Sequence, residues 1–373
     1  MPWIHFHIGN AGTAQACCVA NIPYGNINEQ SLEEIWNGPE INQLRAKFIK
    51  GETDNRCANC HRLEAAGAKS IRQETFEKFA HIKVDEVEVQ LPIYFDIRFS
   101  NVCNFRCRTC WHGASSRWFN DAKVLGTNIG EQAILTNIKD VKSFIENSAE
   151  ALLGAEEFYF AGGEPLVTEG HYLLLEWLIE NKATQARLRY NTNFSKLDFQ
   201  DYDLLKLWSH FTQVELLASI DASGMLGEYI RKEMNWKTLV ENRERIKALP
   251  HVAFKIAPTV SVFNVLELPD LYQECLASGM IEAGDIYINI LERPNYYNIQ
   301  ILPEAEKSNV QLRYQQFYNW LAEKQAPTQV ASNFKEIISY MMESDRSNLW
   351  PRFQQQTAQL DELRGESFDE VKA

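Results

Sequence analysis

The chain has 373 residues, of which 45% are hydrophobic and 23% are charged, as in an ordinary folded protein and unlike a disordered or collagen-like one. Its net charge of −13 argues against a general nucleic-acid binder, which needs a basic surface to neutralise phosphates. The richest apolar stretch, residues 172–179, is much shorter than the ~20 residues of a membrane span. The first residues also lack a signal-peptide pattern, so we expect a cytoplasmic protein without a membrane partner.

Two local patterns stand out near the beginning of the chain. His5 and His7 alternate with apolar residues, which is typical of a strand, and we expect both imidazoles to face solvent rather than a metal. Ser31 and Glu34 form a capping box, in which the two side chains bind each other's backbone N–H groups. The box predicts a helix that begins there and runs toward Ile49.

The first cysteines of the chain form two tight groups. Cytoplasmic thiols stay reduced, so the cysteines are better interpreted as metal ligands or buried thiols than as disulfides. Cys17 and Cys18 are adjacent, and Cys57 and Cys60 form a CxxC pair. If these thiols bind one metal site, Cys17, Cys57 and Cys60 are its first three ligands. Cys18 is the simplest fourth ligand, although the side chains of adjacent residues in an extended chain point in opposite directions. His61 or an open position for substrate is the alternative, and a structural zinc ribbon on the four thiolates is another.

A third cysteine group follows an apolar, β-rich run over 93–99, which predicts a strand that leads into it. It consists of Cys103, Cys107 and Cys110 in the pattern CxxxCxxC. The count is informative, because a closed structural zinc site needs four ligands, whereas a cubane held by three thiolates keeps one iron open. A zinc knuckle that borrows His112 is the alternative.

Strands alternate with helices after this loop, which indicates parallel βαβ units. After a helical stretch to about Leu153, the later strands are expected over 156–160, 187–190, 214–221, 253–262 and 286–291. The helices between them are expected over 170–182, 198–208, 236–249 and 266–278. Cys275 lies in the last of these and is expected to be a buried thiol. Six strands predict an α/β fold, a partial (β/α)6 barrel.

The tail of the chain is predicted to be helical. Helices are expected over 305–324, 334–342 and 350–363. We therefore expect three regions, which are a small α+β domain over 1–85, the barrel over 86–300 and a helical extension over 301–373.

Polar residues and glycines follow the expected strands, where the mouth of such a barrel lies. Gly162, Gly163 and Glu164 form a turn after the second strand, in which glycine backbone can approach a ligand closely. Glu164 can accept hydrogen bonds from an ammonium group. Asn193 and Ser219 end the next two strands.

The CxxxCxxC loop after the first strand and the GGEP turn after the second resemble the motifs of the radical S-adenosylmethionine (SAM) superfamily. The resemblance covers about residues 92–291. It implies that Cys103, Cys107 and Cys110 hold a [4Fe-4S] cluster whose open iron binds the amino and carboxylate groups of SAM. Thr109 stands where this superfamily often has a bulky apolar residue, which weakens the expected contact with adenine.

The same resemblance implies a set of SAM-binding residues. Gly162, Gly163 and Glu164 would bind the amino group, and Arg231 the carboxylate. The remaining contacts, to carboxylate or ribose, would come from Asn193 and Ser219. The residues alone leave other roles open, since Asn193 and Asp221 could cap the next helices and Arg231 could be a surface charge.

The N-terminal motifs resemble the SPASM/twitch domain, an auxiliary iron–sulfur module that normally follows a radical SAM barrel and here would precede it. They are Gly12-x4-Cys17, Gly25-Asn-Ile, the capping-box helix and the CxxC pair. The two-cluster form of this module needs more than four cysteines. The resemblance therefore implies one auxiliary [4Fe-4S] cluster, on Cys17, Cys18, Cys57 and Cys60.

Together the resemblances imply a radical SAM enzyme of oxidoreductase type, with a flavodoxin- or ferredoxin-type electron donor. It would cleave SAM reductively and abstract a hydrogen atom from a substrate, with the auxiliary cluster serving electron transfer or substrate binding. A peptide is the first expectation, because SPASM/twitch relatives often modify peptides. A sugar, a nucleoside or another small metabolite is the alternative, and a zinc-bearing interaction protein without enzymatic activity is the alternative of a different class.

Overall fold

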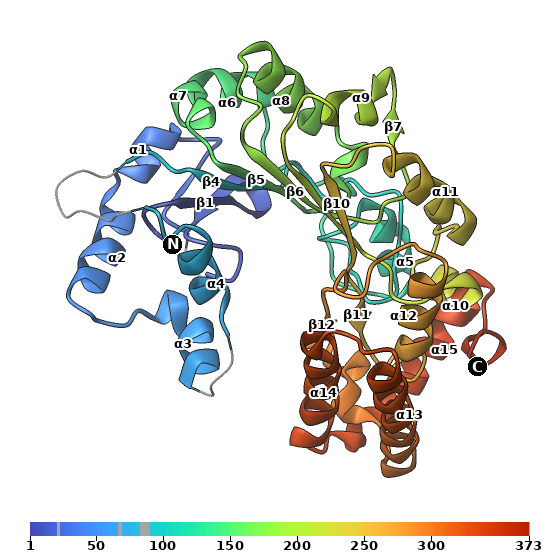
Figure 1. Ribbon diagram of the computed structural model, residues 1–373. Coiled ribbons are helices and arrows are strands. Elements are labelled where there is room, and N and C mark those ends of the chain that lie inside the picture. Colours follow the sequence, from blue (N-terminus) through green and yellow to red (C-terminus); the bar gives the residue numbers. More distant parts are fainter. Residues whose placement is uncertain (21–22, 66–68, 83–89, 373) are drawn as a thin grey trace. The chain divides into compact units, whose positions relative to one another are not determined.

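The computed structural model describes residues 1–20, 23–65, 69–82 and 90–372 (Figure 1). The chain forms two compact units, each made of several segments. Unit 1 comprises Met1–Val102, Ile134–Tyr190 and Gln200–Val214, and unit 2 comprises Cys103–Ala133, Asn191–Phe199 and Glu215–Ala373. The boundary expected between residues 85 and 86 lies outside the described residues, and the three expected regions stay a prediction.

The fold is mixed α/β, as predicted, and is built on a sheet with the strand order β10-β9-β6-β5-β4-β1-β2-β3. The first four strands in the chain are β1 (His5–Ile8), β2 (Thr13–Gln15), β3 (Gly25–Asn26) and β4 (Tyr94–Ile97). They are followed by β5 (Glu157–Phe160), β6 (Arg187–Thr192), β9 (Val214–Ala218) and β10 (Val252–Ile256). From β4 to β10 the strands lie side by side in chain order, which is the succession that parallel βαβ units produce.

The sixth expected strand is present but short. β12 (Asn289–Ile290) pairs in parallel with β11 (Thr259–Val260), and a parallel bridge joins Ile256 to Ile286. The order of the six expected strands is thus confirmed, but the single strand expected over 253–262 is wrong, because it is divided into β10 and β11 and β11 belongs to a separate sheet with β12. In addition to these strands, β1 pairs in parallel with β4, so the N-terminal segment extends the same sheet.

Helices cover one face of the strands in unit 1. Figure 1 shows α6 (Val141–Asn147), α7 (Ala149–Leu153), α8 (Glu169–Glu180) and α9 (Leu204–Trp208) along β4, β5 and β6. Aromatic and aliphatic side chains on that face of the sheet, among them Phe95, Phe158 and Leu188, are fully buried. The apolar face of the strands therefore forms the core beneath the helices.

The N-terminal helix begins as predicted but is broken. Ser31 and Glu34 form both hydrogen bonds of the capping box, which confirms the start of α1 (Leu32–Trp36). The predicted run to Ile49 is wrong, because Gly38 is extended and Pro39 begins a second helix, α2 (Pro39–Ile49). The other helices of this segment are α3 (Ala58–Ala65) and α4 (Ile71–Lys78).

One predicted helix of the barrel region is half wrong. The expected helix over 198–208 is reduced to α9, because its first residues form the short strands β7 (Asp198–Phe199) and β8 (Tyr202–Asp203). Gln200 takes a φ of 50° between them, which a helix does not allow. Asp203 then caps α9 through its carboxylate.

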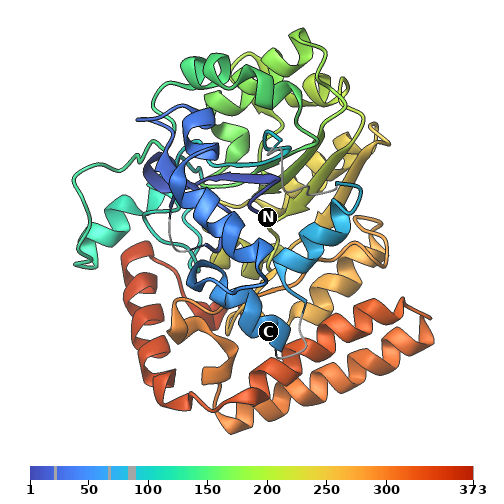
Figure 2. The ribbon, with the colours of Figure 1, turned by 90° about the vertical axis from the view of Figure 1, so that its left-hand side faces the viewer.

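Unit 2 contains the remaining helices. The last three, α13 (Glu304–Glu323), α14 (Thr328–Glu343) and α15 (Trp350–Arg364), confirm the predicted helical tail, and α13 and α14 pack side by side (Figure 2). The other helices of this unit are α5 (Phe119–Val124), α10 (Gly224–Ile230), α11 (Trp236–Ile246) and α12 (Leu268–Ala277). Cys275, predicted to be buried, is fully buried in α12.

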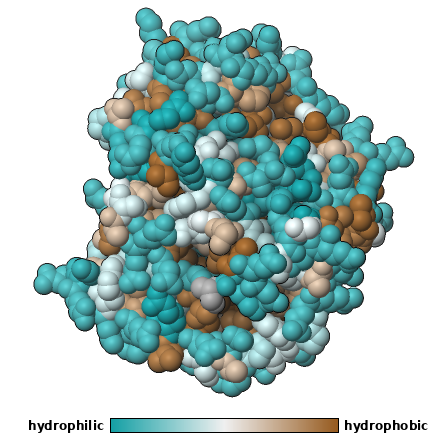
Figure 3. All heavy atoms as spheres, turned by 90° about the vertical axis from the view of Figure 1, so that its right-hand side faces the viewer, coloured by the Kyte–Doolittle hydropathy of each residue, from teal (hydrophilic) through white to brown (hydrophobic). Residues whose placement is uncertain are grey.

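Hydrophilic residues cover most of the face shown in Figure 3, and hydrophobic residues lie on it in small groups. Among the described residues, no helix combines the length and the apolar character needed to cross a lipid bilayer.

Candidate functional site

The loop Cys103–Cys110 in unit 2 has no regular secondary structure and is held by hydrogen bonds from the segment that follows it. Ser115 Oγ donates to the carbonyl of Phe105 at 2.6 Å, and Trp118 Nε1 donates to the carbonyl of Cys107 at 2.7 Å. Phe105 is almost fully buried and anchors the middle of the loop. The loop is therefore fixed by tertiary contacts rather than by a local helix or strand.

A buried cation faces one of the three thiols. Arg231 Nη1 lies 3.8 Å from Cys107 Sγ, and Nη2 and Nε of the same guanidinium each lie 2.9 Å from the carboxylate of Asp221. Burial raises the pKa of Cys107, although Arg231 opposes the shift, and burial raises the pKa of Cys110 to about 12. Arg231 is thus placed to stabilise a thiolate at Cys107.

The residue after the first cysteine takes part in a closed ring of hydrogen bonds. Asn193 Nδ2 donates to Asn104 Oδ1 at 2.8 Å, Asn104 Nδ2 donates to Ser195 Oγ at 2.8 Å, and Ser195 Oγ donates to Asn193 Oδ1 at 2.7 Å. The ring joins the end of β6 to the cysteine loop within unit 2. Asn193 and Asp221 do not act as helix caps, since both side chains are engaged in these loop contacts.

The GGEP turn in unit 1 packs against the strand end that leads into the cysteine loop. A Cβ on Gly163 would lie 2.1 Å from the carbonyl oxygen of Val102, the residue before the first cysteine, so the close approach requires glycine. The N–H of Glu164 donates to the same carbonyl at 2.7 Å, and its Oε1 accepts from the N–H of Leu166 at 3.0 Å. Gly162 has a φ of 119°, which again favours glycine.

The N-terminal thiols are divided between two surroundings in unit 1. Cys17, Cys57 and Cys60 line one small cavity, together with apolar side chains such as Phe48. Cys18 does not line it, and the groups whose charges act most on Cys18 are Asp96 and Arg98, followed by Cys60. Burial raises the pKa of Cys17 to about 12 and that of Cys18 to about 11.

The donor sets suit iron–sulfur clusters by their chemistry, since three thiols line one cavity in the N-terminal segment and three lie on one loop of eight residues in unit 2. Within the described residues, no group of three or more His, Cys, Asp or Glu side chains is placed so that it could hold a single metal ion. A cluster does not require that arrangement, because its thiolates bind different iron atoms. His61 does not line the cavity of Cys17, Cys57 and Cys60.

One face of the sheet in unit 1 carries polar side chains that the sequence did not reveal. In register across β1, β4, β5 and β6 lie two rows, His5–Tyr94–Glu157–Arg187 and His7–Asp96–Tyr159–Arg189. The prediction that His5 and His7 face solvent is wrong, because β1 lies inside the sheet between β2 and β4 and both imidazoles are buried.

Charge pairing accounts for the buried carboxylate of the second row. His7 Nδ1 lies 2.9 Å from Asp96 Oδ2, and Arg98 Nε lies 3.7 Å from Asp96 Oδ1. Burial alone would raise the pKa of Asp96, but His7 and Arg98 outweigh it and lower the pKa. Burial lowers the pKa of His5 to about 3, so this imidazole is neutral.

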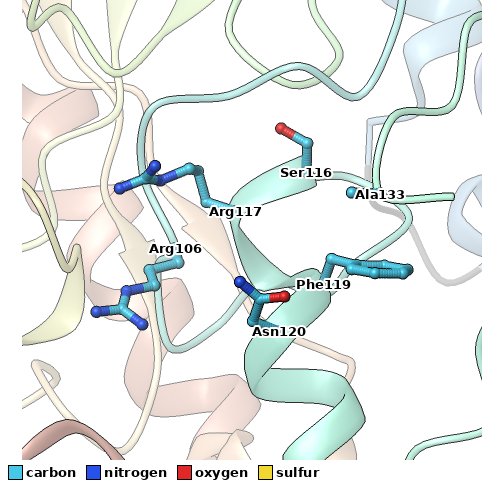
Figure 4. Close-up of a pocket in the computed structure, with 6 residues that line it drawn as sticks. All are labelled: Arg106, Ser116, Arg117, Phe119, Asn120 and Ala133. Atoms are coloured by element: carbon cyan, nitrogen blue, oxygen red, sulfur yellow. The ribbon is translucent and has the colours of Figure 1, made fainter.

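A pocket of about 310 Å³ lies beside the cysteine loop in unit 2 (Figure 4). The guanidinium groups of Arg106 and Arg117 lie on one side of it in this view, and the ring of Phe119 lies on the other. Ser116, which also lines it, accepts a hydrogen bond from the N–H of Cys103 at 3.3 Å. Arg106 is already paired with Asp121 at 2.9 Å, so the pocket is not a free anion site on that side.

The predicted SAM-binding residues divide between the units. Asn193, Ser219 and Arg231 belong to unit 2 with the cysteine loop, and Ser219 is joined to β6 through its N–H, which donates to the carbonyl of Thr192 at 2.8 Å. Gly162, Gly163 and Glu164 belong to unit 1. Their roles toward SAM stay predictions. The sequence did not indicate that Arg108 and its partners near the C-terminus belong to the site. The charged residues between the cysteines were the only signal that could have pointed to them.

Residues 1–61 match the family model of SPASM, an iron–sulfur cluster-binding domain. The match confirms the resemblance of the N-terminal motifs to this domain. A search of curated proteins gives no match for the chain.

In all, 31 chains of solved structures are similar to this chain. Native anSMEcpe with bound AdoMet is 18% identical over 62% of this chain and 61% of that one, with a TM-score of 0.45. Native anSMEcpe with bound AdoMet and Kp18Cys peptide is 16% identical over 62% of this chain and 60% of that one, with a TM-score of 0.43. Streptococcus suis SuiB bound to S-adenosylmethionine is 11% identical over 73% of this chain and 59% of that one, with a TM-score of 0.39. The chain spans about three fifths of the length of these solved proteins.

Proposed function

We propose that this protein is a radical SAM enzyme with an auxiliary iron–sulfur cluster in its N-terminal segment. The observation that carries the proposal is the loop of three thiols after the first strand of a parallel βα succession, with Arg231 facing Cys107. When bound, a reduced [4Fe-4S] cluster supplies one electron to SAM, which splits into methionine and a 5′-deoxyadenosyl radical that takes a hydrogen atom from substrate. Cys103, Cys107 and Cys110 would hold that cluster.

The chain's own residues would bind and orient SAM. Glu164 is buried and uses Oε1 to cap the following turn, and an ionised carboxylate has further lone pairs to accept from the SAM ammonium. Arg231 binds Asp221 through Nε and Nη2 and approaches Cys107 through Nη1. A guanidinium has five N–H donors, so further N–H groups of Nη1 and Nη2 can bind the SAM carboxylate. Asn193 and Ser219 would complete the contacts at the strand ends.

The auxiliary cluster is assigned to Cys17, Cys57 and Cys60, with Cys18 as the fourth ligand of the proposal. The SPASM match over residues 1–61 and the shared cavity of the first three thiols support it. This cluster would accept an electron from the substrate or bind the substrate. A flavodoxin- or ferredoxin-type protein would supply the electrons for SAM cleavage.

The two polar rows on the sheet of unit 1 support a polar substrate. Tyr159, Arg187 and Arg189 of these rows are partly exposed and carry polar groups on the face opposite the apolar core. A peptide, with its regular succession of N–H and C=O groups, suits such a surface, and it is the first substrate class of the proposal. Sugars, nucleosides and other small metabolites are the second.

The proposal is tested on anaerobically purified protein reduced with dithionite. A brown protein that contains iron and sulfide and releases 5′-deoxyadenosine from SAM supports it. A colourless protein with stoichiometric zinc and no SAM cleavage would instead support the zinc-bearing interaction protein. Supplying reduced flavodoxin in place of dithionite tests the electron donor separately.

A further inference from the structure

The geometry of the cysteine loop depends on residues far away in the sequence. The loop has no regular secondary structure, so its own residues do not determine where its thiols lie. Two of its N–H groups are bound by the last residue of α10 and the segment that follows it. Arg108 N–H donates to the carbonyl of Ile230 at 2.7 Å, and Arg106 N–H donates to that of Lys232 at 3.2 Å. The side chains of the loop make the longer-range contacts.

Arg108, which lies between Cys107 and Cys110, is fully buried and bound by the C-terminal segment. Its Nη2 donates to Asp361 Oδ1 at 2.5 Å and to Glu366 Oε2 at 2.7 Å. Its guanidinium also lies 3.6 Å from the centre of the Tyr229 ring. A buried cation needs such partners, because an unpaired charge in the interior is strongly unfavourable.

The same segment reaches the other side of the loop through Arg364. Arg364 Nε donates to Asp121 Oδ2 at 2.9 Å, while Asp121 Oδ1 accepts from Arg106 Nη1 at 2.9 Å. The Arg364 guanidinium lies 4.8 Å from the centre of the Trp118 ring, and Trp118 donates to the carbonyl of Cys107. The C-terminal segment is thus connected to the residues on both sides of Cys107.

We propose that residues 361–366 position the thiols of the cysteine loop, so that the C-terminal extension is a structural part of the cluster site. The contacts to Arg108, Arg106 and Trp118 hold the loop in one conformation before any cluster is present. A loop that is already ordered loses less entropy when it binds a cluster. The inference rests on the proposed function only in that the thiols hold a cluster, because the ordering of the loop itself requires no metal.

The test uses the full chain with Asp361→Asn and, separately, Glu366→Gln. Glu362→Gln is the matched control, because Glu362 is exposed, lies beside Asp361 on α15 and loses the same charge. The first readout is hydrogen–deuterium exchange of residues 103–110 in the iron-free protein. We expect at least about tenfold faster exchange at the Arg108 amide in both variants and no change in the control.

The second readout is the loss of iron to a chelator from the reconstituted protein. We expect the loop iron to leave at least about tenfold faster in Asp361→Asn and Glu366→Gln than in the wild type and in Glu362→Gln. If Asp361→Asn does not fold, Glu366→Gln, which leaves Asp361 on Arg108, carries the test. Loop exchange and iron loss equal to the control in a folded variant would overturn the inference.

Failure of the proposed function has a different signature. A wild-type protein that binds no iron but shows the accelerated loop exchange in the variants would refute the cluster and leave the positioning role intact. A wild-type protein that binds iron and cleaves SAM, with unchanged exchange in the variants, would refute the positioning role alone.

Discussion

The two cysteine sets differ in how the chain brings them together. Cys103, Cys107 and Cys110 are neighbours in the sequence, yet their loop is held by charged residues that are far away in the chain, such as Asp361. Cys17 and the pair Cys57 and Cys60 lie in separate segments, and they meet at a cavity with an apolar lining. The spacing in the sequence therefore reveals the first set but not where its thiols lie in the fold. The second set comes together only when its whole segment folds.

Their electrostatic surroundings differ as well. Arg231 lies 3.8 Å from Cys107 and opposes the rise in its pKa that burial causes, whereas the thiols around Cys17 add to the rise that burial causes there. Metal ligands must be deprotonated, so the buried thiols of both sets, such as Cys17 and Cys110 with a pKa of about 12, depend on the metal itself to release their protons.

The largest effect is expected in the loop. Cys103→Ala, Cys107→Ala and Cys110→Ala should each abolish the formation of 5′-deoxyadenosine, because a cubane with two protein thiolates is not held at the site. The measurement is chromatographic detection of the nucleoside under dithionite. Cys275→Ala, which removes a buried thiol in α12, is the control and should retain cleavage. Retained cleavage in any loop variant would refute the assignment of that ligand.

The second prediction concerns the N-terminal set. Cys57→Ala combined with Cys60→Ala should lower the iron content by about four per chain, because a cubane loses two of its thiolates. SAM cleavage should survive at least in part, because the loop cysteines are untouched. Iron analysis and the cleavage assay on one reconstituted sample check both statements. An unchanged iron content would exclude an N-terminal cluster.

The third prediction concerns SAM binding. Glu164→Gln should weaken SAM affinity by roughly 10- to 150-fold, which is the change in affinity expected from losing one charge-assisted hydrogen bond. The iron content should stay intact. The amide oxygen can still cap Leu166, so the melting temperature should change little. Arg231→Ala should weaken affinity too, and to a smaller extent. Wild-type affinity in Glu164→Gln would remove the GGEP turn from the binding site.

The fourth prediction separates two adjacent thiols. Cys17→Ser should reduce the auxiliary iron more than Cys18→Ser, because Cys17 lines the cavity with Cys57 and Cys60, while Cys18 lies near Asp96 and Arg98. Iron content and the electron paramagnetic resonance spectrum of each variant measure the difference. Equal losses would make the two thiols equivalent ligands, contrary to their positions.

The smallest effect is expected at Asp54, which binds Arg56 and Lys47 just before Cys57. Hydrogen bonds from Arg56 are the main cause that lowers the pKa of Asp54. A lowered pKa stabilises the fold fully above the unfolded value of about 4, and this contribution decreases as the pH falls from that value through the lower pKa of the folded state. Asp54→Asn should therefore cost about 1–2 kcal/mol at pH 7 and less near pH 3, as measured by urea unfolding. An equal loss at both pH values would contradict the pairing.

Sequence patterns predicted the features that local chemistry determines. The capping box at Ser31, the buried Cys275 and the six strands were visible because each depends on neighbouring residues. The burial of His5 was not visible, since it depends on a strand that comes much later in the chain. For the same reason, the pairing of Arg108 with Asp361 could not be read from the cysteine motif.

The parallel pairing of β1 with β4 has a consequence for how the chain folds during synthesis. Residues His5–Ile8 leave the ribosome long before Tyr94–Ile97, by roughly 5–20 s at ordinary rates of translation. In that interval β1 can pair with β2, which follows it closely, but its other edge stays open. Such an edge is a template for wrong pairing, and closing a loop of this length is slow. We expect nascent chains that stop before β4 to aggregate or to bind chaperones, and chains that include β4 to escape both.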